Sequence, residues 1–291
     1  MERHREKRLP DGKRHRRRFA LFSILIAVFG KILKLTGLYR LGERNALDIV
    51  VNRFEVSFPD LPKAFDGYTL MQLTDLHLDS HSAATQRLIE AVDGLTVDAV
   101  VLTGDYRAKI SGPFEQIMPA FEAILGAVRA RDGIFGILGN HDTIDMVEPF
   151  ERLGVTMLAN QTVTLDRGTD RIHIVGVDDV HYYFTDQAAA TLREAPPGFK
   201  IALIHSPELV PEAASAGMSL YLAGHTHGGQ ICLPGGLPII CHMAAPRRYA
   251  TGLWRKGGMI GYTSTGVGTS GLPVRFNSRS EVALITLRRD A

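Results

Sequence analysis

Histidine, aspartate and asparagine recur in this sequence directly after short apolar runs, at spacings suited to holding a metal ion. The segment Gly224–Gln230 places His225 and His227 two residues apart, among glycines, after the apolar run 218–223. Glycine permits a sharp turn there and the close approach of a bound ion. One His-x-His pair is a weak indication alone, so its value depends on whether ligand-type residues follow other strands.

The same arrangement occurs at four further places along the chain. Asp75 and His77 follow the run 68–73, Asp105 follows 99–102, Asn140, His141 and Asp142 follow 134–138, and His205 closes 200–204. Each run has the length and β-branched content of a buried strand. Layered α/β proteins place their ligand-bearing loops at the carboxyl ends of strands, so we expect these side chains to converge.

The donor atoms of this set indicate which ions it suits. Carboxylate and amide oxygens with imidazole nitrogens favour Mn, Fe or Zn over Ca²⁺. The set comprises Asp75, His77, Asp105, Asn140, His205, His225 and His227. Seven ligands exceed the needs of one ion and suit two divalent ions about 4 Å apart that share a carboxylate. Such a pair activates a bridging hydroxide and neutralises phosphoryl charge, as phosphate-ester hydrolysis requires.

The elements that must position these residues alternate along the first half of the chain. After an opening strand at 48–58, the strands at 68–73, 99–102 and 134–138 are separated by amphipathic patterns at 82–95 and 113–130, and a further helix at 144–153 follows the third strand. Paired strands at 161–177, a helix at 188–194, and strands at 201–204, 220–223, 259–263 and 282–287 follow. This pattern predicts an α/β layered fold, built from two sheets or from one sheet with helices.

The motif order D-x-H, G-D, G-N-H-D, H, G-H-x-H over residues 68–230 resembles that of the calcineurin-like metallophosphoesterases. The resemblance implies a layered β-sandwich flanked by helices. It implies a first metal on Asp75, His77 and His227, a second metal on Asn140, His205 and His225, and Asp105 as the bridge. It also implies catalytic roles for His141, as proton donor or charge stabiliser at the leaving-group oxygen, and for Asp142, which would orient His141.

The closing block 266–276, followed by Glu281 and Val282, is similar to that of a bacterial branch, the YaeI/YkuE-like phosphodiesterases. Ser280 stands where that branch usually has proline. Arg275 is a candidate phosphate contact or a salt-bridge partner of Glu281. Some relatives of the branch hydrolyse the pyrophosphate of UDP-2,3-diacylglucosamine in lipid A synthesis. The resemblance therefore implies a phosphodiesterase or pyrophosphatase acting on a lipid-linked substrate. The alternatives are a membrane-tethered phosphoprotein phosphatase and a general phosphodiesterase of the cell envelope.

Charge is unevenly distributed along the chain. Residues 1–44 hold thirteen Lys and Arg against four Asp and Glu, whereas the remainder holds twenty against twenty-seven. The mildly acidic body argues against a nucleic-acid partner. We predict a basic arm at 1–44 with an apolar membrane-associating segment at 19–39, and a metallophosphoesterase domain at 45–291.

Residues 14–39 have a basic-then-apolar pattern that permits three interpretations. They are a signal-anchor helix, an interfacial helix on anionic lipid and a cleaved export signal. We expect this segment to associate with a bacterial inner membrane, with the side left open. Cys232 and Cys241 form no C-x-x-C motif, which disfavours a structural zinc site, and a disulfide or two free thiols both remain open.

Overall fold

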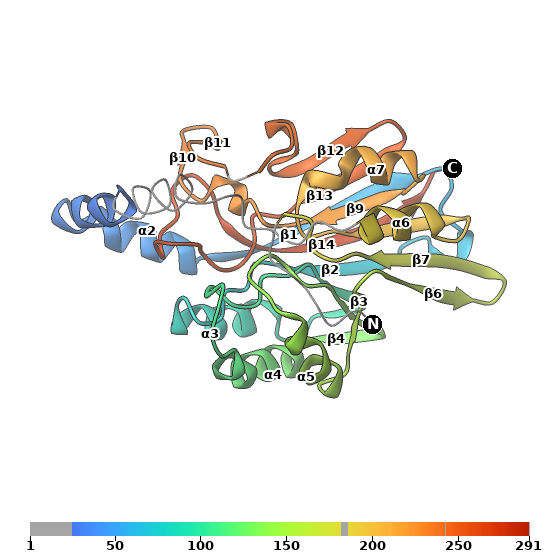
Figure 1. Cartoon of the computed structure of the whole chain (residues 1–291), viewed down its shortest axis with the longest axis horizontal. Coiled ribbons are helices and arrows are strands. Elements are labelled where there is room, and N and C mark those ends of the chain that lie inside the picture. Colours follow the sequence, from blue (N-terminus) through green and yellow to red (C-terminus); the bar gives the residue numbers. More distant parts are fainter. Residues whose placement is uncertain (1–24, 182–185, 242, 291) are drawn as a thin grey trace.

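Two stacked six-stranded sheets form the centre of the molecule (Figure 1). The computed structural model describes residues 25–181, 186–241 and 243–290. The first sheet has the order β1 (Ile49–Phe58), β14 (Ser280–Arg289), β2 (Thr69–Leu73), β3 (Thr96–Leu102), β4 (Arg129–Gly136), β5 (Val155–Met157). The second has the order β12 (Gly252–Lys256), β13 (Met259–Thr263), β9 (Leu220–Ala223), β8 (Phe199–Leu203), β7 (Asp170–Gly176), β6 (Gln161–Arg167). A small hairpin pairs β10 (Cys232–Leu233) with β11 (Leu237–Pro238).

Helices cover the outer face of each sheet. α3 (Ser82–Val92), α4 (Met118–Ala127) and α5 (Val147–Arg152) lie on the first sheet, and α6 (Asp186–Glu194) and α7 (Val210–Ser215) lie on the second (Figure 1). Short 3-10 turns occupy Lys63–Phe65, Glu115–Ile117, Ile144–Met146, Pro207–Leu209, His227–Gly229 and Arg247–Tyr249. The expected layered α/β sandwich flanked by helices is therefore confirmed.

The central strands are continuous apolar runs in the sequence because both of their faces are buried. Leu70 of β2 and Val101 of β3 pack between the two sheets, whereas the neighbouring Met71 and Val100 pack beneath the helices. A strand buried on both faces carries apolar residues at every position. The helix expected at 113–130 is shorter than predicted, because α4 begins at Met118, with Pro119 in its first turn, and the chain becomes extended again at Arg129.

Strand direction brings the loops of interest to one edge of the structure. β2, β3 and β4 are parallel, and so are β7, β8 and β9. The carboxyl ends of parallel strands meet at the same edge of their sheet. The segments that follow β2, β3, β4, β8 and β9 are those in which the sequence predicts metal ligands.

The described chain begins with helical residues 25–35, followed by α2 (Leu38–Leu47). α2 runs unbroken through the predicted domain boundary at residue 44, and it packs on the loop before β14, where the backbone nitrogen of Arg275 donates to the Gly42 carbonyl over 2.9 Å. Among the described helices, none is both long and apolar enough to cross a bilayer. Residues 14–24 of the predicted membrane segment lie outside the described residues.

Candidate metal centre

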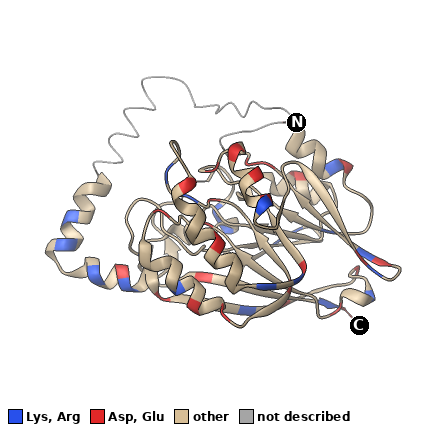
Figure 2. Ribbon diagram, turned by 90° about the horizontal axis from the view of Figure 1, so that it is seen from below, with Lys and Arg blue, Asp and Glu red and all other residues tan. Residues whose placement is uncertain are grey.

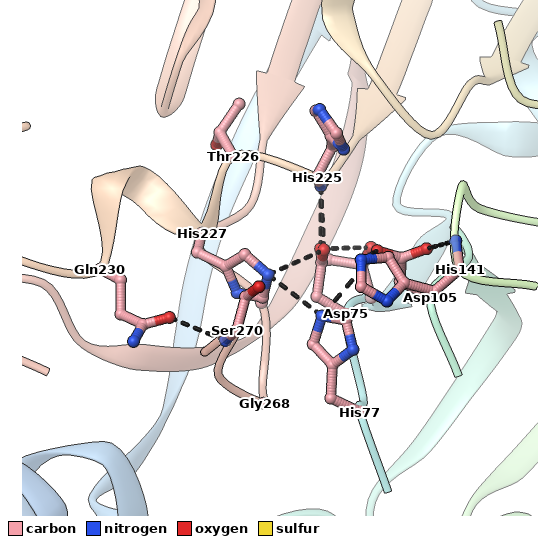
Figure 3. A network of polar contacts seen from close by, with 12 residues as sticks. Asp75, His77, Asp105, His141, His225, Thr226, His227, Gln230, Gly268 and Ser270 are labelled. Carbon is pink, nitrogen blue, oxygen red and sulfur yellow. Dashed lines mark hydrogen bonds and ion pairs between the residues drawn. The ribbon is translucent and has the colours of Figure 1, made fainter. Parts of the chain in front are cut away.

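The seven predicted ligands lie together at the ends of five strands. Asp75 and His77 follow β2, Asp105 follows β3, Asn140 follows β4, His205 follows β8, and His225 and His227 follow β9. All seven are buried. Figure 3 shows the side chains of Asp75, His77, Asp105 and His227 converging, together with His141, while the backbone nitrogen of His225 donates to Asp75. The structure thus places in one cluster residues that are up to 152 positions apart in the sequence.

Asp75, His77 and His227 form one side of the cluster. The Nε2 atom of His227 lies 3.5 Å from Asp75 Oδ1 and 3.1 Å from Nε2 of His77. Nε2 of His77 also lies 3.8 Å from Oδ2 of Asp105. This first group therefore borders directly on the Asp105 carboxylate.

Asp105, Asn140, His205 and His225 form the other side. Oδ2 of Asp105 lies 3.4 Å from Nε2 of His205. The amide oxygen of Asn140 lies 3.0 Å from the same His205 nitrogen and 2.8 Å from Nδ1 of His225. Asp105 therefore stands between the two groups, within 4 Å of an imidazole nitrogen from each.

These residues fit a pair of divalent cations. Two donors bound to one cation at about 2.1 Å lie about 3.0 to 3.4 Å apart at coordination angles between a right angle and the tetrahedral value. The 3.1 Å between the two Nε2 atoms of His77 and His227 matches that separation. Burial lowers the pKa of His77 to about 4 and that of His227 well below its usual range. Two neutral imidazoles that face each other in this way are suited to share a cation.

The other ring nitrogens fix how two of these imidazoles point. Nδ1 of His77 donates to the Arg107 carbonyl over 2.9 Å, and Nδ1 of His205 donates to the Thr103 carbonyl over 2.7 Å. A backbone acceptor on Nδ1 selects the tautomer with a free electron pair on Nε2. In both residues Nε2 is the atom that faces the cluster.

The backbone at the ligands is unusual. Asp75, His77, Asp105, His225 and His227 all have φ between 41° and 68°, in the left-handed region. This conformation is uncommon and unfavourable for residues other than glycine, and it concentrates at functional sites. No sequence pattern predicts this left-handed backbone conformation, because it follows from tight turns that the surrounding loops impose.

Glycines allow these loops to pack against one another. A Cβ atom at Gly104, Gly139 or Gly224 would lie closer than 3.0 Å to atoms of a neighbouring ligand loop. For Gly104 and Gly139 the obstacle includes backbone atoms, which cannot rotate away. Glycine at these positions is therefore required by the approach of the loops that carry the candidate ligands.

His141 lies at the rim of the cluster. Its Nδ1 donates to the Ala108 carbonyl over 2.6 Å, and its Nε2 lies 3.8 Å from Oδ2 of Asp105. The side chain is 15% exposed, more than any of the seven candidate ligands. A substrate at the cluster can therefore reach this ring.

Asp142 holds the loops beneath the site. It is fully buried and accepts hydrogen bonds from the backbone nitrogens of Asp105, Tyr106 and Gly139 at 2.8, 3.0 and 2.7 Å. Nδ1 of the His141 ring bonds the Ala108 carbonyl, and the orienting of His141 by Asp142 stays a prediction. Asp142 positions the backbone of the Asp105 loop.

Arg275 differs from both roles suggested by its sequence. Its guanidinium is completely buried and donates to the carbonyls of His227, Thr265 and Gly268 at 3.1, 2.7 and 2.7 Å. Glu281 instead accepts hydrogen bonds from the hydroxyls of Tyr262 and Ser264. Arg275 is thus neither a phosphate contact nor a salt-bridge partner of Glu281. Its hydrogen bonds connect the loop that contains Thr265 and Gly268 to the turn at His227.

His181 belongs to the site surroundings but was absent from the predicted site residues. Its ring centroid lies 4.4 Å from that of His225, and its Nδ1 lies 2.8 Å from Glu208 Oε1. Burial opposes protonation, but the hydrogen bond and charge of Glu208 raise the pKa of His181. His181 follows β7 as the ligands follow their strands, and this signal could have identified it.

Comparison with known proteins extends this picture. A family model described as calcineurin-like phosphoesterase matches residues 68–229. YkuE of Bacillus subtilis, described as an uncharacterized metallophosphoesterase, is 30% identical over 240 residues, covering 78% of this chain and 82% of the relative. YkoQ of the same organism, with the same description, is 27% identical, covering 90% and 98%. Phosphodiesterase YaeI of Escherichia coli is 28% identical, covering 65% and 70%.

Proposed function

Because this chain belongs to the calcineurin-like phosphoesterase family and is a metal-dependent phosphoester hydrolase, we propose that it cleaves phosphodiester or pyrophosphate bonds of amphipathic substrates at a bacterial inner membrane. The observation that carries the proposal is the place of Asp105, between two groups of buried imidazoles. One carboxylate shared by two donor groups is the arrangement that a pair of cations needs.

We assign the first cation to Asp75, His77 and His227, the second to Asn140, His205 and His225, and Asp105 to both. Bound Mn, Fe or Zn ions would lower the pKa of water and withdraw charge from the phosphoryl oxygens.

The chain's own residues complete the chemistry. His141 is the one site histidine that combines partial exposure with a ring nitrogen turned toward Asp105. Its hydrogen bond to the Ala108 carbonyl holds the ring in place, so that Nε2 faces the cluster where a leaving oxygen would develop charge. We assign proton donation to that oxygen to His141, while Asp142 and Arg275 keep the ligand loops in register.

The substrate class rests on the N-terminal region. Residues 1–44 are strongly basic, and several apolar side chains of the helical segment 25–35 are exposed. An enzyme held at a bilayer surface can meet a phosphate whose carrier stays in the lipid. We propose UDP-2,3-diacylglucosamine of lipid A synthesis as the specific substrate, reached through membrane association of residues 14–39. The name of the YaeI relative favours a general phosphodiesterase of the envelope as the second candidate.

Full-length protein reconstituted with Mn²⁺ tests these assignments on three substrates: bis(p-nitrophenyl) phosphate, UDP-2,3-diacylglucosamine and a phosphopeptide. We expect chelator-sensitive cleavage of the aryl phosphodiester and of the pyrophosphate of UDP-2,3-diacylglucosamine, both abolished by Asp105→Asn and by His225→Ala. Asp166→Asn is the matched control, because Asp166 is 61% exposed on β6. Turnover of the aryl diester alone would rule out the proposal of a lipid-linked substrate and would favour a general phosphodiesterase. Turnover of the phosphopeptide alone would replace the proposal with a membrane-tethered phosphatase.

A further inference from the structure

We propose that the end of the molecule beside the metal centre is a docking surface for an anionic lipid bilayer, made jointly by the N-terminal helices and the hairpin β10–β11. This apolar end comprises residues 25–47 and residues 231–240. This inference rests on the proposed function in placing the substrate at a membrane. It adds a second, separate element, the hairpin, that no sequence pattern assigned to membrane contact.

The N-terminal helices expose a row of large apolar side chains. These are Leu25, Val28, Phe29, Ile32 and Leu35 on the helical segment 25–35, and Leu38 and Leu41 on α2. Spacings of three and four residues place such side chains on one helical face. The opposite face of the first segment, with Gly30 and Leu33, is buried against the protein. The exposed row is therefore not used for packing within the described chain, and Leu35 is 88% exposed.

The hairpin exposes a second group of apolar side chains. Leu233, Leu237, Ile239 and Ile240 are each at least half exposed. Residues 231–246 contain no Lys, Arg, Asp or Glu. A surface segment of this length with several exposed Leu and Ile and no charge is unusual in water and marks an interaction site.

One loop joins the two groups into a continuous surface. The backbone of Arg275 bonds Gly42 of α2, and the adjacent Phe276 carbonyl accepts the Cys232 backbone nitrogen over 2.9 Å. Asn45 of α2 also donates to the Arg275 carbonyl over 3.1 Å. The hairpin and α2 thus contact successive residues of the same loop, and Figure 1 shows both at the same end of the molecule.

The apolar end is directly connected to the metal centre. Cys232 begins β10 five residues after the candidate ligand His227, and its thiol donates to the Gly228 carbonyl. A Cβ atom on Gly229 would collide with Pro238 of β11. Docking of the hairpin on a bilayer would therefore bring the His227 side of the site toward the phosphate-bearing layer of the lipid.

Charge identifies the occupant as an anionic bilayer rather than a second copy of the chain. Lys31, Lys34, Arg40 and Arg44 are exposed on the helices, and Glu43 is the one acidic residue among positions 25–47 (Figure 2). The exposed Arg247 and Arg248 follow the hairpin. Two copies of this end would repel each other, whereas anionic headgroups attract basic residues that flank buried apolar side chains.

Vesicle co-sedimentation of the full-length protein tests the docking surface, with phosphatidylcholine vesicles compared with vesicles that also contain phosphatidylglycerol. Leu237→Asp in the hairpin is compared with Leu253→Asp on β12, because the two leucines are 58% and 52% exposed and receive the same charge. We expect binding to the anionic vesicles, weakened about tenfold or more by Leu237→Asp and unchanged by Leu253→Asp. Thermal unfolding of both variants establishes that they are folded.

Vesicle binding can be tested independently of phosphoesterase activity. Asp105→Asn should bind the anionic vesicles as well as the unaltered protein does, so loss of phosphoesterase activity leaves the docking surface intact. Equal vesicle binding by Leu237→Asp and Leu253→Asp would overturn the proposal. Dimers in solution that Leu237→Asp dissociates, without any vesicle binding, would overturn it in favour of a second copy as the occupant.

Discussion

Gly139 precedes Asn140 and packs against the loop that carries Asp105, and its replacement by alanine tests whether the two loops must approach as closely as they do. A Cβ at this position would lie 2.5 Å from the backbone nitrogen of Asp105 and 2.9 Å from its Cγ. Ordinary contact begins near 3.4 Å, so the two loops must separate by about 0.9 Å. The strain arises from this contact alone, because φ of Gly139 is not in the left-handed region.

The size of the effect follows from that displacement. Overpacking a well-filled interior costs about 1–3 kcal/mol of unfolding free energy, which leaves a domain of ordinary stability folded. Displacing a catalytic group by about an ångström costs about a hundredfold in rate. We therefore expect Gly139→Ala to lower kcat/KM about a hundredfold and to weaken metal retention, in protein that still unfolds cooperatively.

Gly126→Ala is the matched control. Gly126 lies in α4, where an added Cβ meets nothing within 4 Å, and alanine in a helix is more stable than glycine by about 0.5–1 kcal/mol. The measurements are hydrolysis of bis(p-nitrophenyl) phosphate, metal content after gel filtration and urea unfolding. If Gly139→Ala keeps its metal and a rate within about threefold of Gly126→Ala, the placement of Asp105 and Asn140 does not control the chemistry.

Three further substitutions probe separate parts of the structure. Arg275→Met removes the donor for several buried carbonyls, so urea unfolding should show a loss of about 3 kcal/mol or more, together with lower metal content; unchanged stability would contradict its positioning role. His141→Asn should lower kcat about a hundredfold or more with metal content unchanged, and more for alkyl than for p-nitrophenyl leaving groups; equal losses would argue against proton donation. Burial alone would raise the pKa of Asp98, but hydrogen bonds from Thr69 and Arg167 lower it, so Asp98 contributes stability that is present above its unfolded pKa of about 4 and is lost as pH falls through the lower folded pKa. Asp98→Asn should therefore reduce the decline of unfolding free energy below about pH 4, and an identical acid limb in both proteins would refute this.

Local patterns were sufficient for the elements that end at the site. The run 220–223 is β9, and the runs 68–73 and 201–204 differ from β2 and β8 by one or two residues at an end. Strands buried on both faces are uniformly apolar, so the ends of each apolar run in the sequence predict the ends of the strand. The pairing of β1 with β14 has no such local signal, because it joins residues 231 positions apart, such as Ile49 and Ser280.

The sequence and the tertiary structure likewise determine different features of the candidate metal centre. The identity and order of the candidate ligands are properties of the sequence, since each donor atom belongs to one side chain that follows one strand. The position of Asp105 between two groups, the tie between Arg275 and the His227 turn, and the proximity of His181 to His225 are properties of the tertiary structure. They depend on how closely separate loops approach, and no run of neighbouring residues encodes the distance between His77 and His227, which are 150 positions apart. The sequence alone thus determined which chemistry is available, and only the packing of the two sheets decided which atoms meet to perform it.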